Sequence, residues 1–253
     1  MNSYLISDIL VMTKRNLTHV MRLPQLIVFS TIQPVMFVLL FAYVFGGAIK
    51  TGTVDYINYL LPGILVQTTV FGSMMTGVGL AADMAQGIID RFRSLPMARS
   101  SFLIGRTISD LVRNVFVVAL MILVGILIGF RFEGGFFNGL AAVGMMLLFG
   151  FAFSWISATI GMTVKNVETA QSAGFIWVFP LVFASSIFVP VETMSKGVRI
   201  FAEHNPVSYT ANTVRALTMG TPVGDNIYYA LAWIIGIMVI FIPLAVNRYR
   251  KIN

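Results

Sequence analysis

Residues 227–246 read IYYALAWIIGIMVIFIPLAV, twenty residues without a charged side chain. An α-helix of about 20 apolar residues spans the hydrocarbon core of a bilayer, because every backbone polar group is satisfied inside the helix. The chain then turns basic at Arg248, Arg250 and Lys251. An apolar run that ends in cations is typical of a segment that crosses a membrane and stops at its cytoplasmic face. This stretch therefore predicts a helical membrane protein.

Five further apolar segments precede it, and they lie at 25–46, 57–81, 103–129, 137–162 and 169–187. Over the 253 residues, 57% are hydrophobic and 11% are charged. Soluble domains carry about 25% charged residues, so a soluble fold has too little interior for this chain. We expect an all-α integral membrane protein with six transmembrane helices. Because the spans use about half of the chain, residues 1–253 are expected to form one transmembrane domain.

The segment 3–23 precedes the first span and has an amphipathic pattern. Its two sides consist of Leu5, Ile9, Met12, Asn16 and Val20 on one, and Asp8, Lys14, Arg15 and Arg22 on the other. Such a helix lies in the membrane interface, with its apolar side in lipid and its basic side toward anionic headgroups. A frayed cytosolic tail is the alternative reading.

Two connecting segments do not fit a simple loop. Residues 82–101 mix charged and apolar side chains and predict a short helix between Asp83 and Pro96. Residues 188–226 are partly apolar, but their apolar runs are too short to span. One or two short re-entrant or interfacial helices fit this outer segment best.

The charges predict the orientation of the chain. Six spans place both termini on one side, together with twelve of the 17 Lys and Arg residues, whereas the ten acidic residues divide evenly. The positive-inside rule makes that side cytoplasmic. The net charge of +7 is thus explained by topology in a cytoplasmic membrane, and no nucleic-acid partner is needed to account for it.

The sequence lacks the residues that common catalytic sites require. It has no cysteine and two histidines, and it contains no phosphate-binding G-x-x-x-x-G-K-[ST] loop. We therefore expect no catalytic residues, no metal site and no ATPase activity in this chain. Asp110 is the only acid inside a predicted span, which leaves an ion-coupled mechanism little to work with.

Arg106, Asp110 and Arg113 lie four and three residues apart at the start of span 103–129. This spacing places them on one helix face, where they can pair. We expect a structural charge cluster near the cytoplasmic interface rather than a substrate site.

The run GIIDRFRSLPMAR at 87–99 resembles the cytoplasmic segment of ABC-2 type permeases, the membrane subunits of type-2 ABC exporters such as daunorubicin-resistance permeases and polysaccharide exporters. The pieces LPGI at 61–64, FPL at 179–181 and HNPVSY at 204–209 with Arg215 are also similar to this family. The resemblance covers nearly the whole chain in order, and the SLPMAR and NPVSY pieces together are fairly specific.

The resemblance implies a permease that pairs with a second permease, as a homodimer or a related heterodimer, above two ABC ATPase subunits that bind ATP and Mg²⁺. No cofactor would be bound by this chain itself. A coupling helix would dock into each ATPase, with the contact residues Gln86, Asp90, Arg91, Phe92, Arg93, Leu95 and Pro96. Phe92 and Leu95 would be its apolar anchors. The substrate would be an amphipathic, drug-like or lipid-like molecule that moves outward.

The same resemblance implies that the outer segment gates the exit, with Pro190, Glu192, His204 and Pro206 as candidate residues. Simple surface exposure of Glu192 and His204, and a solvated charge run around Arg91, are the plainer readings. Two other functions remain open: a stand-alone ion-coupled carrier, and a membrane scaffold that transports nothing. Dependence of transport on a proton gradient without an ATPase would favour the carrier.

Overall fold

The structure is a computed structural model that describes residues 3–22, 24–45, 55–93, 99–164 and 166–251. All regular structure in these ranges is helical. The elements are α1 (Ser3–Arg22), α2 (Pro24–Leu40) with a π-helix (Phe41–Phe45), α3 (Tyr56–Ala85), α4 (Ile88–Arg93), α5 (Arg99–Leu127), α6 (Gly135–Gly161), α7 (Val167–Phe183), a 3₁₀ turn (Val191–Thr193), α8 (Lys196–Glu203), α9 (Pro206–Met219) and α10 (Asn226–Lys251).

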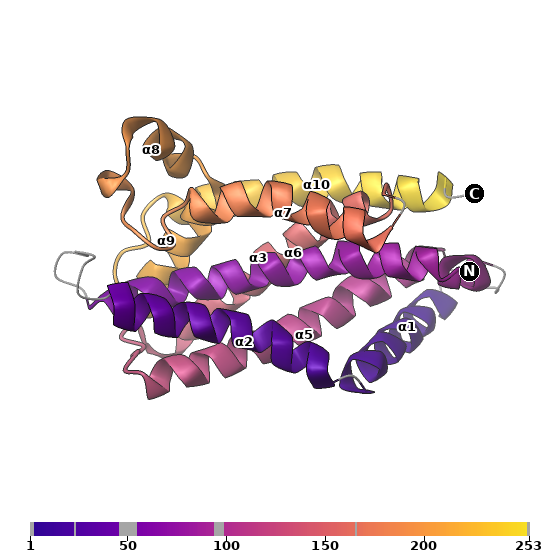
Figure 1. Ribbon diagram of the computed structural model, residues 1–253, viewed down its shortest axis with the longest axis horizontal. Helices are drawn as coiled ribbons and strands as arrows, with labels where there is room; N and C mark the ends of the chain where they lie inside the picture. Colours follow the sequence, from indigo (N-terminus) through magenta and orange to yellow (C-terminus); the bar gives the residue numbers. More distant parts are fainter. Residues whose placement is uncertain (1–2, 23, 46–54, 94–98, 165, 252–253) are drawn as a thin grey trace.

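The long helices run roughly along one axis, with the N- and C-terminal ends of the chain at one end of the bundle and α8 and α9 at the other (Figure 1). Four of the described helices, α3, α5, α6 and α10, are long and apolar enough to cross a membrane. Two shorter apolar helices lie at Thr31–Val44 and Val167–Phe183. The fold is thus that of a helical, multi-pass integral membrane protein. Helices cover most of each of the six expected ranges, but α7 ends at Phe183, four residues before the end of the range 169–187.

The centre of the bundle is α3, which is buried along most of its length and packs against α5, α6, α7 and α9. Its approach to α6 is close because glycines face each other. A Cβ atom on Gly161 would collide with the backbone of Gly77, and one on Gly77 would collide with the carbonyl of Ser157. In a membrane, where the hydrophobic effect does not drive helix association, such small residues let backbones meet and gain van der Waals contact.

The apolar core has two parts. The larger cluster fills the middle and outer part of the bundle around Leu61, Ile64 and Phe149. The smaller cluster lies toward the end that carries the termini and joins α1, α3, α4, α5, α6 and α10 through side chains such as Met12, Ile89 and Phe102. The second cluster holds the short helices α1 and α4 against the ends of the spans.

Exposed aromatic side chains mark the outer end of the bundle. Phe136 and Phe137 at the start of α6 are 79% and 84% exposed, and Tyr228 at the start of α10 is 70% exposed. Aromatic residues collect at the level of the lipid headgroups, because one end of the ring is wet and the other is in lipid. These residues suit a position at a membrane–water boundary near the starts of α6 and α10.

The connecting segments differ in detail from the expectation. In 82–101, α3 continues through Asp83 to Ala85, and the short helix α4 begins only at Ile88, after a turn in which Gly87 adopts φ +65°. In 188–226, two short helices form as expected, but α9 packs into the bundle against α3, α6 and α10.

Candidate functional site

The helix α4 is attached to the terminal end of the bundle by its apolar side. Ile89 is buried, and the ring of Phe92 packs 5.7 Å from that of Phe102 on α5. Phe92 also lies 4.8 Å below the guanidinium carbon of Arg15 on α1. The contacts of Phe92 are therefore within this chain, and its role as an anchor for an ATPase stays a prediction.

The other predicted coupling residues are placed as follows. Gln86 and Arg91 are exposed. Leu95 and Pro96 lie outside the described residues, as do the side chains of Asp90 and Arg93. The exposed surface next to α4 is thus polar, and the apolar side of α4 faces the chain's own core.

The charge cluster joins α5 to the last turn of α3, the helix that precedes α4. Asp110 is buried and pairs with Arg113 at 3.3 Å and with Arg106 at 3.5 Å, and Thr76 donates a hydrogen bond to its carboxylate at 2.7 Å. Arg106 also pairs at 2.9 Å with Asp83, in the last turn of α3. Two arginines and two aspartates thus balance each other, as buried charges in a membrane protein require. The spacing on α5 predicts the first two pairs, whereas the link to α3 depends on packing.

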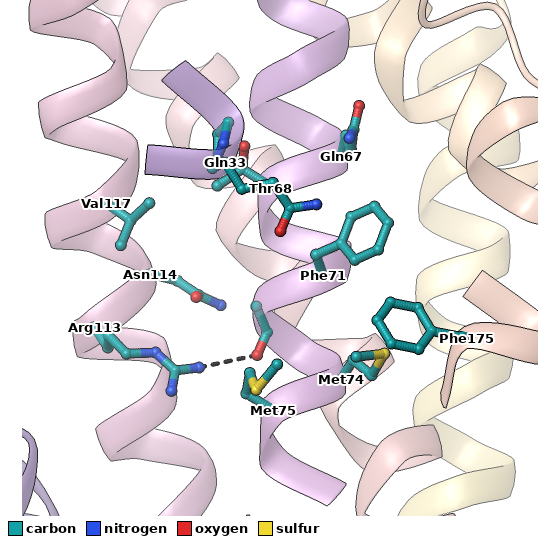
Figure 2. Close-up of a pocket in the computed structure, with 12 residues that line it drawn as sticks. Gln33, Gln67, Thr68, Phe71, Met74, Met75, Arg113, Asn114, Val117 and Phe175 are labelled. Atoms are coloured by element: carbon teal, nitrogen blue, oxygen red, sulfur yellow. Dashed lines mark hydrogen bonds between the residues drawn. The ribbon is translucent and has the colours of Figure 1, made fainter. Parts of the chain in front are cut away.

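A cavity of about 90 Å³ lies between α2, α3, α5 and α7, a few residues further into the membrane (Figure 2). Its polar lining comes from Gln33, Gln67, Thr68, Arg113 and Asn114, and its apolar lining from Pro34, Phe71, Met74, Met75, Val117 and Phe175. Arg113 belongs to both the cavity and the charge cluster, and it donates to the carbonyl of Gly72 at 2.9 Å. The cavity therefore touches the network that reaches α3 near α4.

One polar atom in the cavity wall is unsatisfied. The Oε1 atom of Gln67 is buried and has no hydrogen-bond partner in the described part of the chain, whereas Thr68 donates its hydroxyl to the carbonyl of Ile64 at 2.8 Å. A buried amide without a partner is costly, so this oxygen would favour a polar group that donates to it. The rings of Phe71 and Phe175, which also line the cavity, lie 6.5 Å apart. The wall thus combines an aromatic side with a hydrogen-bonding side.

This cavity was not predicted from the sequence. Sequence patterning alone gives no role to Gln33, Gln67 or Asn114. The available signal was the presence of amide side chains inside otherwise apolar helices. Which of these amides face each other depends on how the helices pack.

The predicted gate residues are spread along the outer segment. Glu192 and His204 are exposed, and the Nδ1 atom of His204 lies 2.9 Å from the carbonyl oxygen of Ile200. Pro190 precedes the 3₁₀ turn and is half-buried, and Pro206 is buried as the first residue of α9. The structure does not gather these four residues into one site.

The NPVSY piece instead fastens α9 to the end of α7. Asn205 accepts a hydrogen bond from the backbone of Val207 at 2.9 Å and so caps α9. Its amide nitrogen donates to the carbonyls of Leu181 and Ala184 at 2.7 and 2.9 Å. An asparagine at this position satisfies orphan groups of two helix ends at once.

Arg215 on α9, which is named from the sequence only as part of the family resemblance, is held by several contacts in the structure. Its side chain donates to the carbonyls of Tyr59 and Ser186 at 2.9 and 3.0 Å and to Asn212 at 2.7 Å, and it stacks 3.7 Å above the ring of Tyr59. Burial lowers the pKa of this guanidinium, but arginine starts so high that it stays charged at neutral pH. Arg215 ties the outer segment to the first turn of α3.

Comparison with known proteins agrees with this arrangement. The profile of the ABC-2 type transporter family matches residues 7–219. The chain is 36% identical to the daunorubicin resistance ABC transporter permease protein DrrB1 of Streptomyces coeruleorubidus over 222 residues, which cover 88% of this chain and 78% of the relative.

Two other relatives are more distant. The probable doxorubicin resistance ABC transporter permease protein DrrC of Mycobacterium tuberculosis is 25% identical over 97% of this chain and 89% of its own length. The putative transport permease ycf38 of Cyanophora paradoxa is 24% identical over 85% of this chain and 75% of its own. A family match over most of the chain, a relative above 30% identity and a helical membrane fold lead to one conclusion: the chain belongs to the ABC-2 type transporter family.

Proposed function

We propose that this chain, a permease subunit of an ABC exporter, moves an amphipathic, drug-like or lipid-like molecule outward across the cytoplasmic membrane. The observation that carries this proposal is the cavity between α2, α3, α5 and α7. At about 90 Å³ the cavity is smaller than the roughly 300–1,000 Å³ that hold drug-sized ligands, so it would have to widen during transport or hold only part of the molecule. Its amides and arginine suit a polar group, and its phenylalanine and methionine side chains suit an apolar one. Methionine adapts to varied shapes, which fits a permissive site. The names of two relatives, which refer to daunorubicin and doxorubicin resistance, support the same class.

Energy would come from a separate ATPase. Two copies of it, carrying ATP and Mg²⁺, would dock beneath two permeases through the segment from Gln86 to Pro96. Closure of the ATPases would move α4 as a rigid body. The pairs of Asp83, Arg106, Asp110 and Arg113 would carry that movement from the turn before α4 to the cavity wall. Phe92 would hold α4 to the bundle so that it cannot move alone.

The topology under this proposal has six spans and cytoplasmic termini. The aromatic residues at the starts of α6 and α10 support an outer boundary at that end, and the excess of Lys and Arg at the other end supports a cytoplasmic one. Residues 188–210 would then cover the exit on the outer side, anchored by Asn205 and Arg215.

An ion-coupled carrier is less well supported. Such carriers use carboxylates that gain and lose a proton inside the membrane. The carboxylate of Asp110 is already engaged by two arginines and a threonine hydroxyl of this chain. A carboxylate in this setting suits a structural role better than proton transfer.

Uptake of daunorubicin into inverted membrane vesicles tests the proposal, with the permease and its ATPase both present. We expect ATP-dependent accumulation, followed by the fluorescence of the drug. Gln67→Leu and Asn114→Leu should each lower the rate about 5- to 10-fold, since each removes a hydrogen bond worth about 1 kcal/mol. Ser154→Ala on α6, which does not line the cavity, serves as the control.

Two outcomes would count against the proposal. If the unchanged protein shows no ATP-dependent accumulation of daunorubicin, the proposal of a drug-like substrate is contradicted. Full activity of both leucine variants would show that the transported molecule does not use this cavity.

A further inference from the structure

The N-terminal helix α1 has three distinct sides. At 3.6 residues per turn, Ile9, Met12 and Asn16 lie on one side, which packs against α5. The approach is close because a Cβ atom on Gly105 of α5 would collide with Met12. This side is therefore committed to the bundle.

A second side of α1 is apolar and uncovered. Ile6 and Leu10, one turn apart, are 67% and 63% exposed. Two large exposed aliphatic side chains on one side of a helix are unfavourable in water, and they suit contact with the acyl region of a bilayer.

The third side is basic. A hollow in the surface is lined by Val11, Lys14, Arg15, Thr18 and Arg22. None of the three cations takes part in a salt bridge found among the described residues. The Nη1 atom of Arg15 is buried and likewise has no hydrogen-bond partner in the described part of the chain. The hollow thus offers donors and positive charge without a matching acceptor.

The position of α1 places this basic side at the depth of the headgroups. Arg22 ends α1, and α2, the first apolar helix, begins at Pro24. In Figure 1 α1 lies at the end of the bundle that carries both termini, which is the cytoplasmic end by charge. Anionic lipids of the cytoplasmic leaflet attract basic segments at this level.

We propose that Lys14, Arg15 and Arg22 bind the phosphate of an anionic phospholipid of the cytoplasmic leaflet, and that the occupied site steadies α4 through Arg15. Phosphate oxygens accept charge-assisted hydrogen bonds from arginine and lysine. Thr18 lines the hollow, but it already donates its hydroxyl to the carbonyl of Lys14 at 2.8 Å. The lipid chains cover Ile6 and Leu10 at the same time. An acidic peptide would match the charges but would leave these apolar side chains in water.

The link to α4 is the stacking of Arg15 on Phe92 at 4.8 Å. A phosphate on the outer edge of the guanidinium fixes its orientation and holds the ring of Phe92 between Arg15 and Phe102. An anionic membrane should therefore raise the ATPase activity of the assembled transporter, because a more firmly held α4 would transmit movement between the ATPase and the membrane helices more efficiently.

The test uses the full permease with its ATPase, reconstituted in phosphatidylcholine alone or in a mixture with phosphatidylglycerol. Retained phosphatidylglycerol is counted by native mass spectrometry, and ATP hydrolysis is measured in the same preparations. We expect the unchanged protein to retain the anionic lipid and to hydrolyse ATP faster in its presence. Inorganic phosphate should not displace the lipid, because it offers no apolar part.

Two double variants each remove two positive charges from the end of the bundle that carries the termini. One removes them from the hollow on α1, and the other removes them from the end of α10. Lys14→Gln with Arg22→Gln should lower phosphatidylglycerol affinity about 10- to 30-fold and abolish the stimulation. Arg248→Gln with Arg250→Gln, on exposed residues at the end of α10, should change neither. The charge-keeping pair Lys14→Arg with Arg22→Lys should retain the lipid and thus separates charge from folding. Phe92→Leu should keep the lipid but lose the stimulation.

Equal lipid retention by the glutamine pair and the α10 control would overturn the proposal. So would loss of the ATPase subunit from the glutamine pair with lipid retention unchanged, since the basic side would then be a protein contact. Displacement of the lipid by inorganic phosphate would show an ion site instead. Lipid retention does not require transport and is independent of the proposed export function, whereas the stimulation of ATP hydrolysis rests on the proposed ATPase partner.

Discussion

Asp110 and Arg215 are both buried charges, and the chain compensates them in different ways. Asp110 is paired with two arginines within one side of α5, whereas Arg215 donates to two backbone carbonyls and an amide. A buried charge that keeps its partners costs little, but it is strongly destabilising once a partner is removed. Both residues should therefore be sensitive to small changes of side chain.

Asp110→Asn should destabilise the protein by roughly 3 kcal/mol or more, because Arg106 and Arg113 lose their shared counter-charge in a buried position. The measurement is thermal unfolding of the purified permease in detergent. Glu203→Gln is the matched control, since it breaks the exposed pair with Arg199, and exposed pairs contribute about 0–1 kcal/mol. Equal unfolding temperatures for the two variants would contradict the role assigned to the cluster.

Arg215→Lys should destabilise the outer segment by about 1–3 kcal/mol. A lysine keeps the charge, but a single ammonium cannot reach three acceptors in a fork and stack on Tyr59. Faster proteolysis between α9 and α10, together with a lower unfolding temperature, would report the loss. Arg199→Lys on the exposed side of α8 should leave both unchanged. An unaltered Arg215→Lys protein would mean that α9 is held without this contact.

At the level of single residues, the sequence predicts contacts within one helix better than contacts between helices. The spacing of Arg106, Asp110 and Arg113 is sufficient to expect their pairing. The partner Asp83 becomes apparent only when α3 and α5 are packed. Arg215 looks like an exposed outer residue in the sequence, because its burial depends on the docking of α9.

At the level of elements, the turn between α3 and α4 sets the orientation of α4 relative to α3. Gly87 adopts φ +65° there, a conformation that a residue with a Cβ atom reaches only with strain. A glycine at this position lets α3 end and α4 turn against the second apolar cluster.

Gly87→Ala should cost about 1 kcal/mol of stability and should shift α4, so that ATP hydrolysis continues while transport falls. The ratio of substrate moved to ATP hydrolysed in proteoliposomes measures this. Gly144→Ala, in the middle of α6 with open space around the added methyl group, is the control and should keep the ratio. If Gly87→Ala also keeps the ratio of substrate moved to ATP hydrolysed, the orientation of α4 does not control the coupling of hydrolysis to transport.

Hydropathy is a good guide to the long helices and a poorer one to their ends. The apolar runs end where lipid ends, whereas α3 and α10 continue as helices through polar residues to Ala85 and Lys251. The π-helix at Phe41–Phe45 and the packing of α9 into the bundle leave no periodic signal in the sequence. Helix lengths outside the membrane depend on local propensity and packing, which hydropathy does not report.

At the level of the whole molecule, three regions follow one another along the bundle axis (Figure 1). The terminal end carries α1, α4 and the charge cluster, the middle carries the cavity, and the outer end carries α8 and α9. Arg113 connects the first region to the second, and Arg215 connects α3 to the third. This order suits a protein that receives movement at one end and releases a substrate at the other.

Purification of the tagged full chain from its native membrane in mild detergent tests most directly whether a separate ATPase drives this permease. Proteins that accompany the chain are identified and counted by mass spectrometry. We predict a soluble protein with a phosphate-binding loop, in one copy for each permease. If the folded permease transports its substrate on a proton gradient alone, with no such protein present, the claim that a separate ATPase drives it is wrong.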